Sequence, residues 1–130
     1  MVDAVADLGA QEFVTLTTYK RSGEAVATPM WVAAQDGRLA FWTPSDSWKV
    51  KRARRDPRVS VAPCNRTGSV PAGAARVGGH AEVLDDDDAV RRVRAAIKRK
   101  YGLVFHVVTV VERVMRRGRE ERTVLLVTLD

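Results

Sequence analysis

The chain has 130 residues, 45% of them hydrophobic and 29% charged, a composition typical of one soluble globular domain. We therefore predict a single domain over residues 1–130. The longest apolar stretch, residues 103–115, is interrupted by polar side chains and is shorter than the roughly 20 residues that cross a bilayer. The first ten residues hold two aspartates and no basic residue, which excludes a secretory signal. The lone Cys64 excludes an internal disulfide and a multi-cysteine metal site, and a cytoplasmic location is expected.

The positive charge of the chain is concentrated in one segment. The formal net charge is +6, and residues 49–58 alone hold six basic side chains and one acid. The remainder of the chain is therefore close to neutral. A polyanionic ligand would explain this cluster, and a phosphate-bearing cofactor or a nucleic acid would both fit it.

Three consecutive strands are predicted in the N-terminal part, over residues 12–19, 25–34 and 39–43. These runs are rich in β-branched and aromatic residues and are separated by tight turns, the second of which contains Asp36-Gly37. Pro29 lies within the second run and cannot donate a hydrogen bond to a neighbouring strand. It therefore requires a sheet edge, a bulge, or a place where the backbone faces something other than a strand.

A short helix follows the third strand. It is expected to begin after Ser45 or Asp46 as the N-cap and to run to about Arg55, where Asp56-Pro57 ends it. Three further strands are expected over residues 58–63, 74–84 and 123–129, with Gly78-Gly79 forming a bulge in the second of them.

Two more helices are predicted before the last strand. Residues 85–88 are four aspartates at the start of a helix that ends at Tyr101-Gly102, and its last turn is basic. This charge order matches the helix dipole, so capping is favoured over a metal site. Residues 103–117 are rich in valine, yet their polar positions recur every three to four residues, which favours a helix over a strand. Residues 118–122 are expected to form a loop, and the total is six strands and three helices in a small α+β barrel.

The segment 39–65 carries the clearest chemical signal. A strand leads into a helix start that holds Thr43, Ser45, Ser47 and Lys49, followed by an arginine-rich stretch. Free backbone N–H groups at a helix start, together with hydroxyls and an ammonium, make a phosphate cradle. An ordinary capped helix with a solvated basic face is the alternative interpretation.

Residues 42–52 (WTPSDSWKVKR) and 54–59 (RRDPRV) resemble the phosphate-binding segment of the flavin/deazaflavin oxidoreductase superfamily, which is related to the pyridoxamine-phosphate oxidases. Residues 28–32 (TPMWV) also resemble its second strand. Residues 61–65 (VAPCN) and 100–102 (KYG) resemble the branch that is dependent on coenzyme F420. The resemblance covers roughly residues 12 to 130 and implies a mainly β, six-stranded antiparallel FMN-binding split β-barrel with short flanking helices.

The resemblance also implies roles for individual residues. Ser47 and Lys49 match the positions that hold the cofactor phosphate, with Thr43 beside them. Residues 28–31 match the strand that lies against the tricyclic ring, where Pro29 would free the backbone from sheet pairing. The remaining cofactor-binding candidates are Trp42 beside the cradle and a basic group that would meet a longer acidic tail, namely Lys51, Arg54 and Arg55. Each pocket of the family is completed by a second subunit, which implies a homodimer.

Other chemically versatile side chains are assigned structural roles. Core packing is the alternative to ring stacking for Trp31, Trp42 and Trp48, and it is favoured for all three. His80 and His106 are expected to be structural, and Cys64 an inert thiol. The sequence contains no nucleophile–base constellation and no metal-ligand spacing, so no catalytic side chain is named. This pattern is typical of redox chemistry performed by a bound cofactor.

The predicted activity is hydride transfer between coenzyme F420 and a small organic acceptor. An FMN-dependent reductase or oxidase on the same fold is the nearest alternative, because FMN has a terminal phosphate but no oligoglutamate tail. The dense arginines of residues 52–58 favour the longer anion. Arginine outnumbers lysine 17 to 5, which suggests a high-GC, actinobacterial genome. A nucleic-acid-binding module and a protein that sequesters heme or flavin without turnover are the more distant alternatives.

Overall fold

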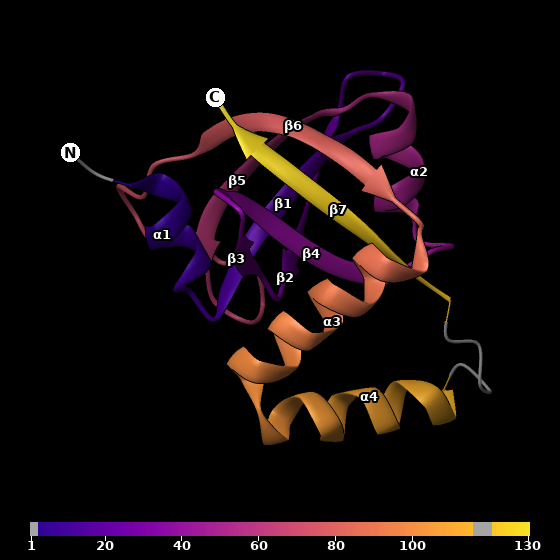
Figure 1. The fold of residues 1–130 in the computed structure, drawn as a ribbon. Coiled ribbons are helices and arrows are strands. Elements are labelled where there is room, and N and C mark those ends of the chain that lie inside the picture. Colours follow the sequence, from indigo (N-terminus) through magenta and orange to yellow (C-terminus); the bar gives the residue numbers. More distant parts are fainter. Residues whose placement is uncertain (1–2, 116–120) are drawn as a thin grey trace.

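The computed structural model describes residues 3–115 and 121–130. Its strands form one antiparallel sheet that curls into a half-barrel, with helices on its outside (Figure 1). The strand order is β2-β1-β5-β6-β7-β4-β3. In chain order the elements are α1 (Ala4–Gly9), β1 (Phe13–Tyr19), β2 (Ala25–Met30), β3 (Ala33–Gln35), β4 (Arg38–Pro44), α2 (Trp48–Arg55), β5 (Arg58–Cys64), β6 (Val77–Leu84), α3 (Asp87–Tyr101), α4 (Leu103–Met115) and β7 (Arg122–Leu129).

The predicted mainly β split barrel is confirmed, but the predicted count of six strands is wrong. The described residues contain seven strands, because the run 25–34 breaks at Trp31 and Val32 into β2 and β3. These two strands lie at opposite ends of the strand order, so the chain crosses from one sheet edge to the other at the break. Strand β2 pairs with β1 alone, and Pro29 therefore lies on an edge strand, one of the placements that the sequence allowed.

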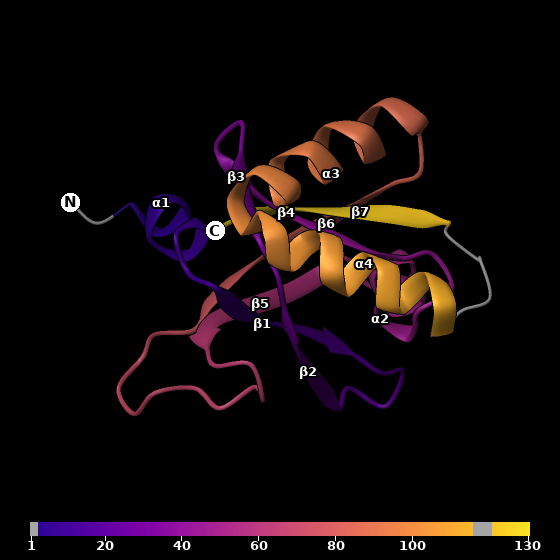
Figure 2. The same cartoon turned by 90° about the horizontal axis from the view of Figure 1, so that it is seen from below.

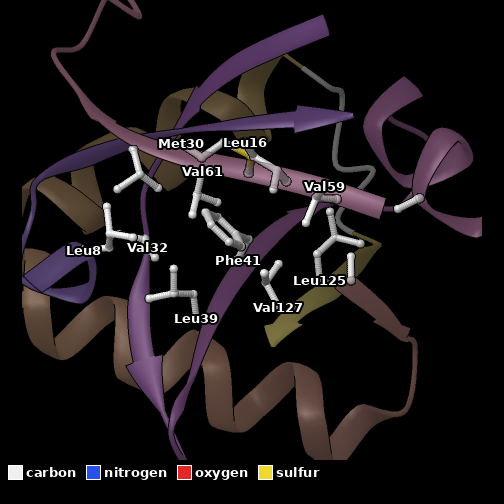
Figure 3. Packing of buried hydrophobic residues seen from close by; sticks show 13 residues of the cluster. Leu8, Leu16, Met30, Val32, Leu39, Phe41, Val59, Val61, Leu125 and Val127 are labelled. Atoms are coloured by element: carbon white, nitrogen blue, oxygen red, sulfur yellow. The ribbon is translucent and has the colours of Figure 1, made fainter. Parts of the chain in front are cut away.

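The core fills the inside of the curled sheet. Figure 3 shows Phe41 at its centre, with aliphatic side chains from the facing strands packed around it. Residues from β1, β4, β5 and β7 are completely or almost completely buried: Val14, Leu16, Leu39, Phe41, Val59, Val61, Leu125 and Val127. Burying one such side chain contributes about 1.5–3 kcal/mol relative to leaving it exposed.

Helices α3 and α4 cover one outer face of the sheet (Figure 2). The Asp86 side chain caps α3 by accepting a hydrogen bond from the backbone N–H of Ala89 at 3.0 Å, which confirms capping by the aspartates. Val93, Ile97 and Phe105 from the two helices pack against strand residues in a second hydrophobic cluster. None of the helices in the described ranges is long and apolar enough to span a membrane.

Three details differ from expectation. Helix α1 was not predicted, and the N-cap of α2 is Ser47 rather than Ser45 or Asp46. Strand β6 begins at Val77, and its pairing is regular on both sides, so the predicted bulge at Gly78-Gly79 is wrong. Gly79 is instead needed for close approach, because a Cβ there would lie 2.5 Å from the carbonyl oxygen of Thr128.

The predicted helix over residues 103–117 is confirmed as far as Met115. Positions 116 and 117 of that helix, and positions 118–120 of the expected loop, lie outside the described residues. Most of the apolar side chains of α4 do not enter the core: Phe105 is fully buried, whereas Val104, Val107 and Val111 are more than half exposed. The spacing of the polar residues therefore predicted the helix correctly, although the valines favoured a strand. A helix can bury a single apolar residue and still present a polar stripe inward.

Candidate functional site

A cavity of about 190 Å³ lies between the sheet and the inner side of α4. Six residues assigned to cofactor binding from the sequence line it: Pro29, Met30, Trp31, Trp42, Thr43 and Lys49. They come from the end of β2, the end of β4 and the first turn of α2, so three separate segments meet here. The structure adds five lining residues that were not predicted: Pro44, Val108, Thr109, Glu112 and Arg122.

The cavity has an aromatic wall. Trp31 stacks on Tyr101 with ring centroids 4.4 Å apart and an interplanar angle of 13°. Trp42 packs against Phe105 at 5.6 Å, and the Arg122 guanidinium lies 4.3 Å from the Trp42 ring centroid. Both tryptophans are half-buried, so each contributes to the outer hydrophobic cluster and also presents surface to the cavity.

The polar part of the cavity has hydrogen-bond donors without acceptors. Thr43 Oγ1 and Trp42 Nε1, from two residues that line the cavity, are buried and have no hydrogen-bond partner within the described residues. Ser47 Oγ is also buried and unpartnered, but Ser47 does not line the cavity. Ser47 is the N-cap of α2, but its side chain makes no capping hydrogen bond. A buried donor left unpaired costs about 1–3 kcal/mol, and a phosphate group offers the acceptor oxygens that would satisfy such donors. These residues therefore fit a bound anion.

Lys49 supplies a cation to the same cavity. Burial lowers the pKa of Lys49 below its ordinary value, and the nearby positive charge of Arg52 lowers it further, while the Glu112 carboxylate opposes both effects. A bound anion would remove much of this electrostatic cost. The first turn of α2 adds backbone N–H groups that no helical carbonyl can reach.

The structure places the other predicted basic residues elsewhere. Lys51 and Arg55 line a separate hollow of about 600 Å³ on the outer side of α2, together with Lys20, Arg21, Trp48 and Arg52. The Trp48 side chain is 68% exposed, and Lys51 Nζ lies 4.4 Å from its ring centroid. Trp48 therefore does not fill the core, contrary to the packing role favoured from the sequence.

Arg54 and Thr28 line neither hollow. Arg54 forms a salt bridge of 2.5 Å with Asp85, whose other carboxylate oxygen lies 2.7 Å from Thr123 Oγ1. The hydrogen bond from Arg54 is the main cause that lowers the pKa of Asp85, and the Thr123 hydroxyl adds to it. Arg54 thus ties α2 to the connection between β6 and α3. Thr28 lies within β2, opposite Leu16 of β1.

A third hollow, of about 700 Å³, adjoins the cavity. Trp31 and Val108 line both spaces and form the boundary between them. Most small-molecule pockets have volumes of about 300–1,000 Å³. The cavity at Lys49 suits a phosphate-sized group, whereas the adjoining hollow has room for a ring system.

The position of Trp31 is held by the end of α3. Tyr101 accepts a hydrogen bond from the backbone N–H of Val32 at 3.0 Å and donates one to the carbonyl of Glu12 at 2.7 Å. Lys100 Nζ donates to the carbonyls of Gly9 and Val32, each at 2.7 Å, and to a third carbonyl in the same region. Burial raises the pKa of Tyr101 to about 12. Residues 100 and 101 therefore pair with backbone N–H and carbonyl groups that lack strand partners at the break between β2 and β3.

Glu112 and Arg122 were missed by the sequence reasoning. Thr109 and Glu112 belong to the polar stripe from which the helix was predicted. That stripe could have indicated that polar side chains of the helix face the inside of the molecule. Arg122 was assigned to a loop, although it is the first residue of β7. Nothing in its immediate sequence indicates that it enters the cavity.

The remaining candidate side chains lie away from the cavity. His80 is exposed and lies 3.5 Å from Asp130, and His106 contacts the edge of the Phe105 ring. Burial raises the pKa of the Cys64 thiol, which keeps it protonated and weakly nucleophilic. Within residues 3–115 and 121–130, no three His, Cys, Asp or Glu side chains are grouped to hold a metal ion.

A family profile described as pyridoxamine 5′-phosphate oxidase matches residues 1–130. The chain belongs to this family. Its half-barrel is accordingly the oxidoreductase fold of the pyridoxamine 5′-phosphate oxidases, which binds flavin-type cofactors. A search of curated proteins gives no match.

Several solved structures share the fold. The conserved hypothetical protein Rv2991 from Mycobacterium tuberculosis is 26% identical, with a TM-score of 0.72 over 99% of this chain and 81% of that one. An F420 reductase is 14% identical, with a TM-score of 0.66 over 100% of this chain and 96% of that one. HutZ, a heme storage protein from Vibrio cholerae, is 10% identical, with a TM-score of 0.67 over 92% and 82%. At their identities the last two establish the fold alone.

Proposed function

We propose that this member of the pyridoxamine 5′-phosphate oxidase family is an oxidoreductase that binds coenzyme F420 and transfers a hydride between it and a small organic acceptor. The observation that carries the proposal is the cavity at the start of α2. It joins the partly buried cation of Lys49 to the unpaired donors of Thr43 and Trp42, and Ser47 adds an unpaired donor at the N-cap of the same helix. This is a donor set for a phosphate group, and the family profile supports a flavin-type cofactor as its carrier.

The division of the basic residues favours F420 over FMN. The phosphate site uses Lys49, while Lys51, Arg52 and Arg55 surround a separate hollow on the outer side of the same helix. FMN ends at its phosphate and has no group to place there. F420 continues beyond its phosphate into a lactyl-oligoglutamate tail, whose carboxylates suit this second set of cations.

The chain's own residues would bind, orient and shield the cofactor. Trp31 and Trp42 bound the cavity with flat apolar surfaces, and side chains of α4 complete its lining. The break after β2 leaves the backbone around Trp31 outside strand pairing, next to the hollow of about 700 Å³. When bound, F420 would supply a two-electron hydride donor that reacts slowly with oxygen.

A homodimer is part of the proposal. The outer face of α4 presents a row of apolar side chains that are each at least 55% exposed: Leu103, Val104, Val107, Val110, Val111 and Val114. An exposed apolar helix face of this length is typical of a subunit interface. A second subunit seated there would also enclose the adjoining hollow, which Val104 and Val108 line.

The decisive experiment is a pair of titrations, one with F420 and one with FMN, on the wild-type protein and on Lys49→Ala. Wild-type protein should bind F420 more tightly than FMN, and high salt should narrow the difference. Lys49→Ala should lose about 1.5–3 kcal/mol of binding free energy, roughly ten- to a hundredfold in affinity. Binding of FMN without detectable binding of F420 would replace the proposal by the FMN-dependent alternative.

Arg58→Ala is the matched control, because Arg58 lies in the same basic segment but interacts with Tyr19 and Asp56 outside the cavity. Its cofactor affinity should equal that of the wild type. A nucleic-acid-binding protein would instead lose affinity for its ligand modestly and similarly in both variants. Turnover of an acceptor by the F420-loaded protein separates an enzyme from a protein that only stores its cofactor.

A further inference from the structure

Arg122 and Glu112 form an ion pair inside the cavity that holds Lys49. The Arg122 side chain is only 10% exposed, and its guanidinium contacts the Glu112 carboxylate while lying over the Trp42 ring. Both residues line the cavity with Lys49 and Thr43. Glu112 belongs to α4 and is more accessible, with 38% of its side chain exposed.

This cluster contains more positive than negative charge. Lys49 is a partly buried cation and Arg122 a largely buried one, and Arg52 adds to the positive potential at Lys49. Glu112 is the carboxylate that acts on both: it pairs with Arg122 and stabilises the charge of Lys49. Isolated charges are costly in such surroundings, so the carboxylate serves as the anion of the cluster.

An incoming phosphate group would compete with Glu112 for the same cations. Lys49, Glu112 and Arg122 line the same cavity, so a phosphate bound between the two cations would lie beside the Glu112 carboxylate. Two carboxylate- and phosphate-sized anions at contact distance also repel each other strongly in a partly desolvated site. The guanidinium donates paired N–H hydrogen bonds in a fixed geometry, and this geometry suits phosphate oxygens as well as carboxylate oxygens.

We propose that Glu112 is a built-in counter-ion of the anion site, and that a phosphate group replaces it at Arg122, which then binds the phosphate together with Lys49. The proposal rests on the anion site described above and names a second cationic ligand and an internal competitor for it. The exchange also confers specificity. Among free anions, inorganic phosphate can carry two negative charges to the cations in place of one carboxylate charge, whereas a monocarboxylate such as acetate carries the same charge as the Glu112 carboxylate that it would replace.

The test uses inorganic phosphate as the probe, with acetate, FMN and F420 titrated in parallel by calorimetry. Glu112→Gln keeps the size and the hydrogen-bond acceptor of the side chain but removes its charge. It should tighten phosphate binding about tenfold or more, the scale of a charge-assisted hydrogen bond. Acetate should bind the wild-type protein at least about tenfold more weakly than phosphate does, by the same argument. Arg122→Gln should weaken phosphate binding by a similar factor.

Glu121→Gln is the control for net charge, because Glu121 is an exposed acid next in sequence to Arg122 and does not line the cavity. Its phosphate affinity should stay within about twofold of the wild type. Equal effects of Glu112→Gln and Glu121→Gln, or unchanged or weaker phosphate binding in Glu112→Gln, would overturn the inference. A fall in melting temperature without a gain in affinity would show that the pair only fastens α4, and would overturn it too.

The two proposals fail separately. If Glu112→Gln tightens phosphate binding while neither F420 nor FMN binds any form of the protein, the counter-ion inference stands and the proposed function is wrong. If F420 binds the wild type and Glu112→Gln equally well, the proposed function stands and the inference is wrong.

Discussion

The Tyr101 hydroxyl joins three segments, and removing it should destabilise the fold by a predictable amount. In Tyr101→Phe the backbone N–H of Val32 loses its acceptor at 3.0 Å, and the carbonyl of Glu12 loses its donor at 2.7 Å. Val32 is fully buried, so its N–H stays unpaired, whereas Glu12 is exposed and its carbonyl can bind water. The expected cost is therefore that of one buried unpaired donor, about 1–3 kcal/mol. This is a sizeable part of a typical domain stability of about 5–15 kcal/mol.

Urea denaturation at pH 7 measures this cost, with Tyr19→Phe as the matched control. The Tyr19 hydroxyl makes no hydrogen bond in the described part of the chain, so its removal should change the free energy of unfolding by less than about 0.5 kcal/mol. If Tyr101→Phe is as stable as Tyr19→Phe, the hydroxyl does not hold the chain at the break between β2 and β3, and the reasoning is refuted.

The pH dependence gives an independent check on the same hydroxyl. The pKa of Tyr101 is raised to about 12 from an ordinary value of 10.0, so the folded state favours the protonated hydroxyl. A raised pKa contributes stability that is fully present below the unfolded value and is lost as pH rises through the folded value. The difference between wild type and Tyr101→Phe should thus be constant up to about pH 10 and shrink toward pH 12.

Four further substitutions test other parts of the structure. Lys49→Met should keep or raise the melting temperature at pH 7, because burial lowers the Lys49 pKa and makes its charge costly. The gain in melting temperature should fade as the pH rises, because the wild-type lysine then deprotonates. Asp85→Asn should be less stable than wild type at pH 7 in urea titrations, and the difference should vanish as pH falls below the ordinary aspartate value of 3.8, because the folded pKa is depressed. Gly79→Ala should lower the free energy of unfolding, measured by urea titration, by about 1–3 kcal/mol, since its Cβ would overlap the Thr128 carbonyl at 2.5 Å. Val111→Lys should yield a monomer in light scattering if the apolar face of α4 is a subunit interface; a wild-type monomer that still binds cofactor would contradict the dimer.

Local sequence patterns sufficed for most of the secondary structure. The acidic start and basic end of α3 matched its dipole, and the cap at Asp86 formed as expected. The polar period of residues 103–115 identified a helix despite their valines. Such features depend on residues three or four positions apart, so a single sequence displays them completely.

Part of the candidate site could be predicted from the sequence for the same reason, because several of its residues lie close together along the chain. Thr43, Ser47 and Lys49 lie within one strand end and one helix start, and the resemblance to a known family assigned them together. The structure brings Thr43 and Lys49 into one cavity with Trp31. It also separates Lys51 and Arg55 from that cavity, because neighbouring residues of a helix point in different directions.

Tertiary structure alone decided where the strand run breaks and what closes the cavity. At the break, Val32 donates a hydrogen bond to Tyr101 and accepts one from Lys100, residues that lie 69 and 68 positions away in sequence. The Arg122 guanidinium likewise enters the cavity through the register of β7 beside β4, where it meets a carboxylate from α4. Burial and pairing of polar groups are properties of the packed chain, and no local pattern in one sequence records which distant residue will satisfy them.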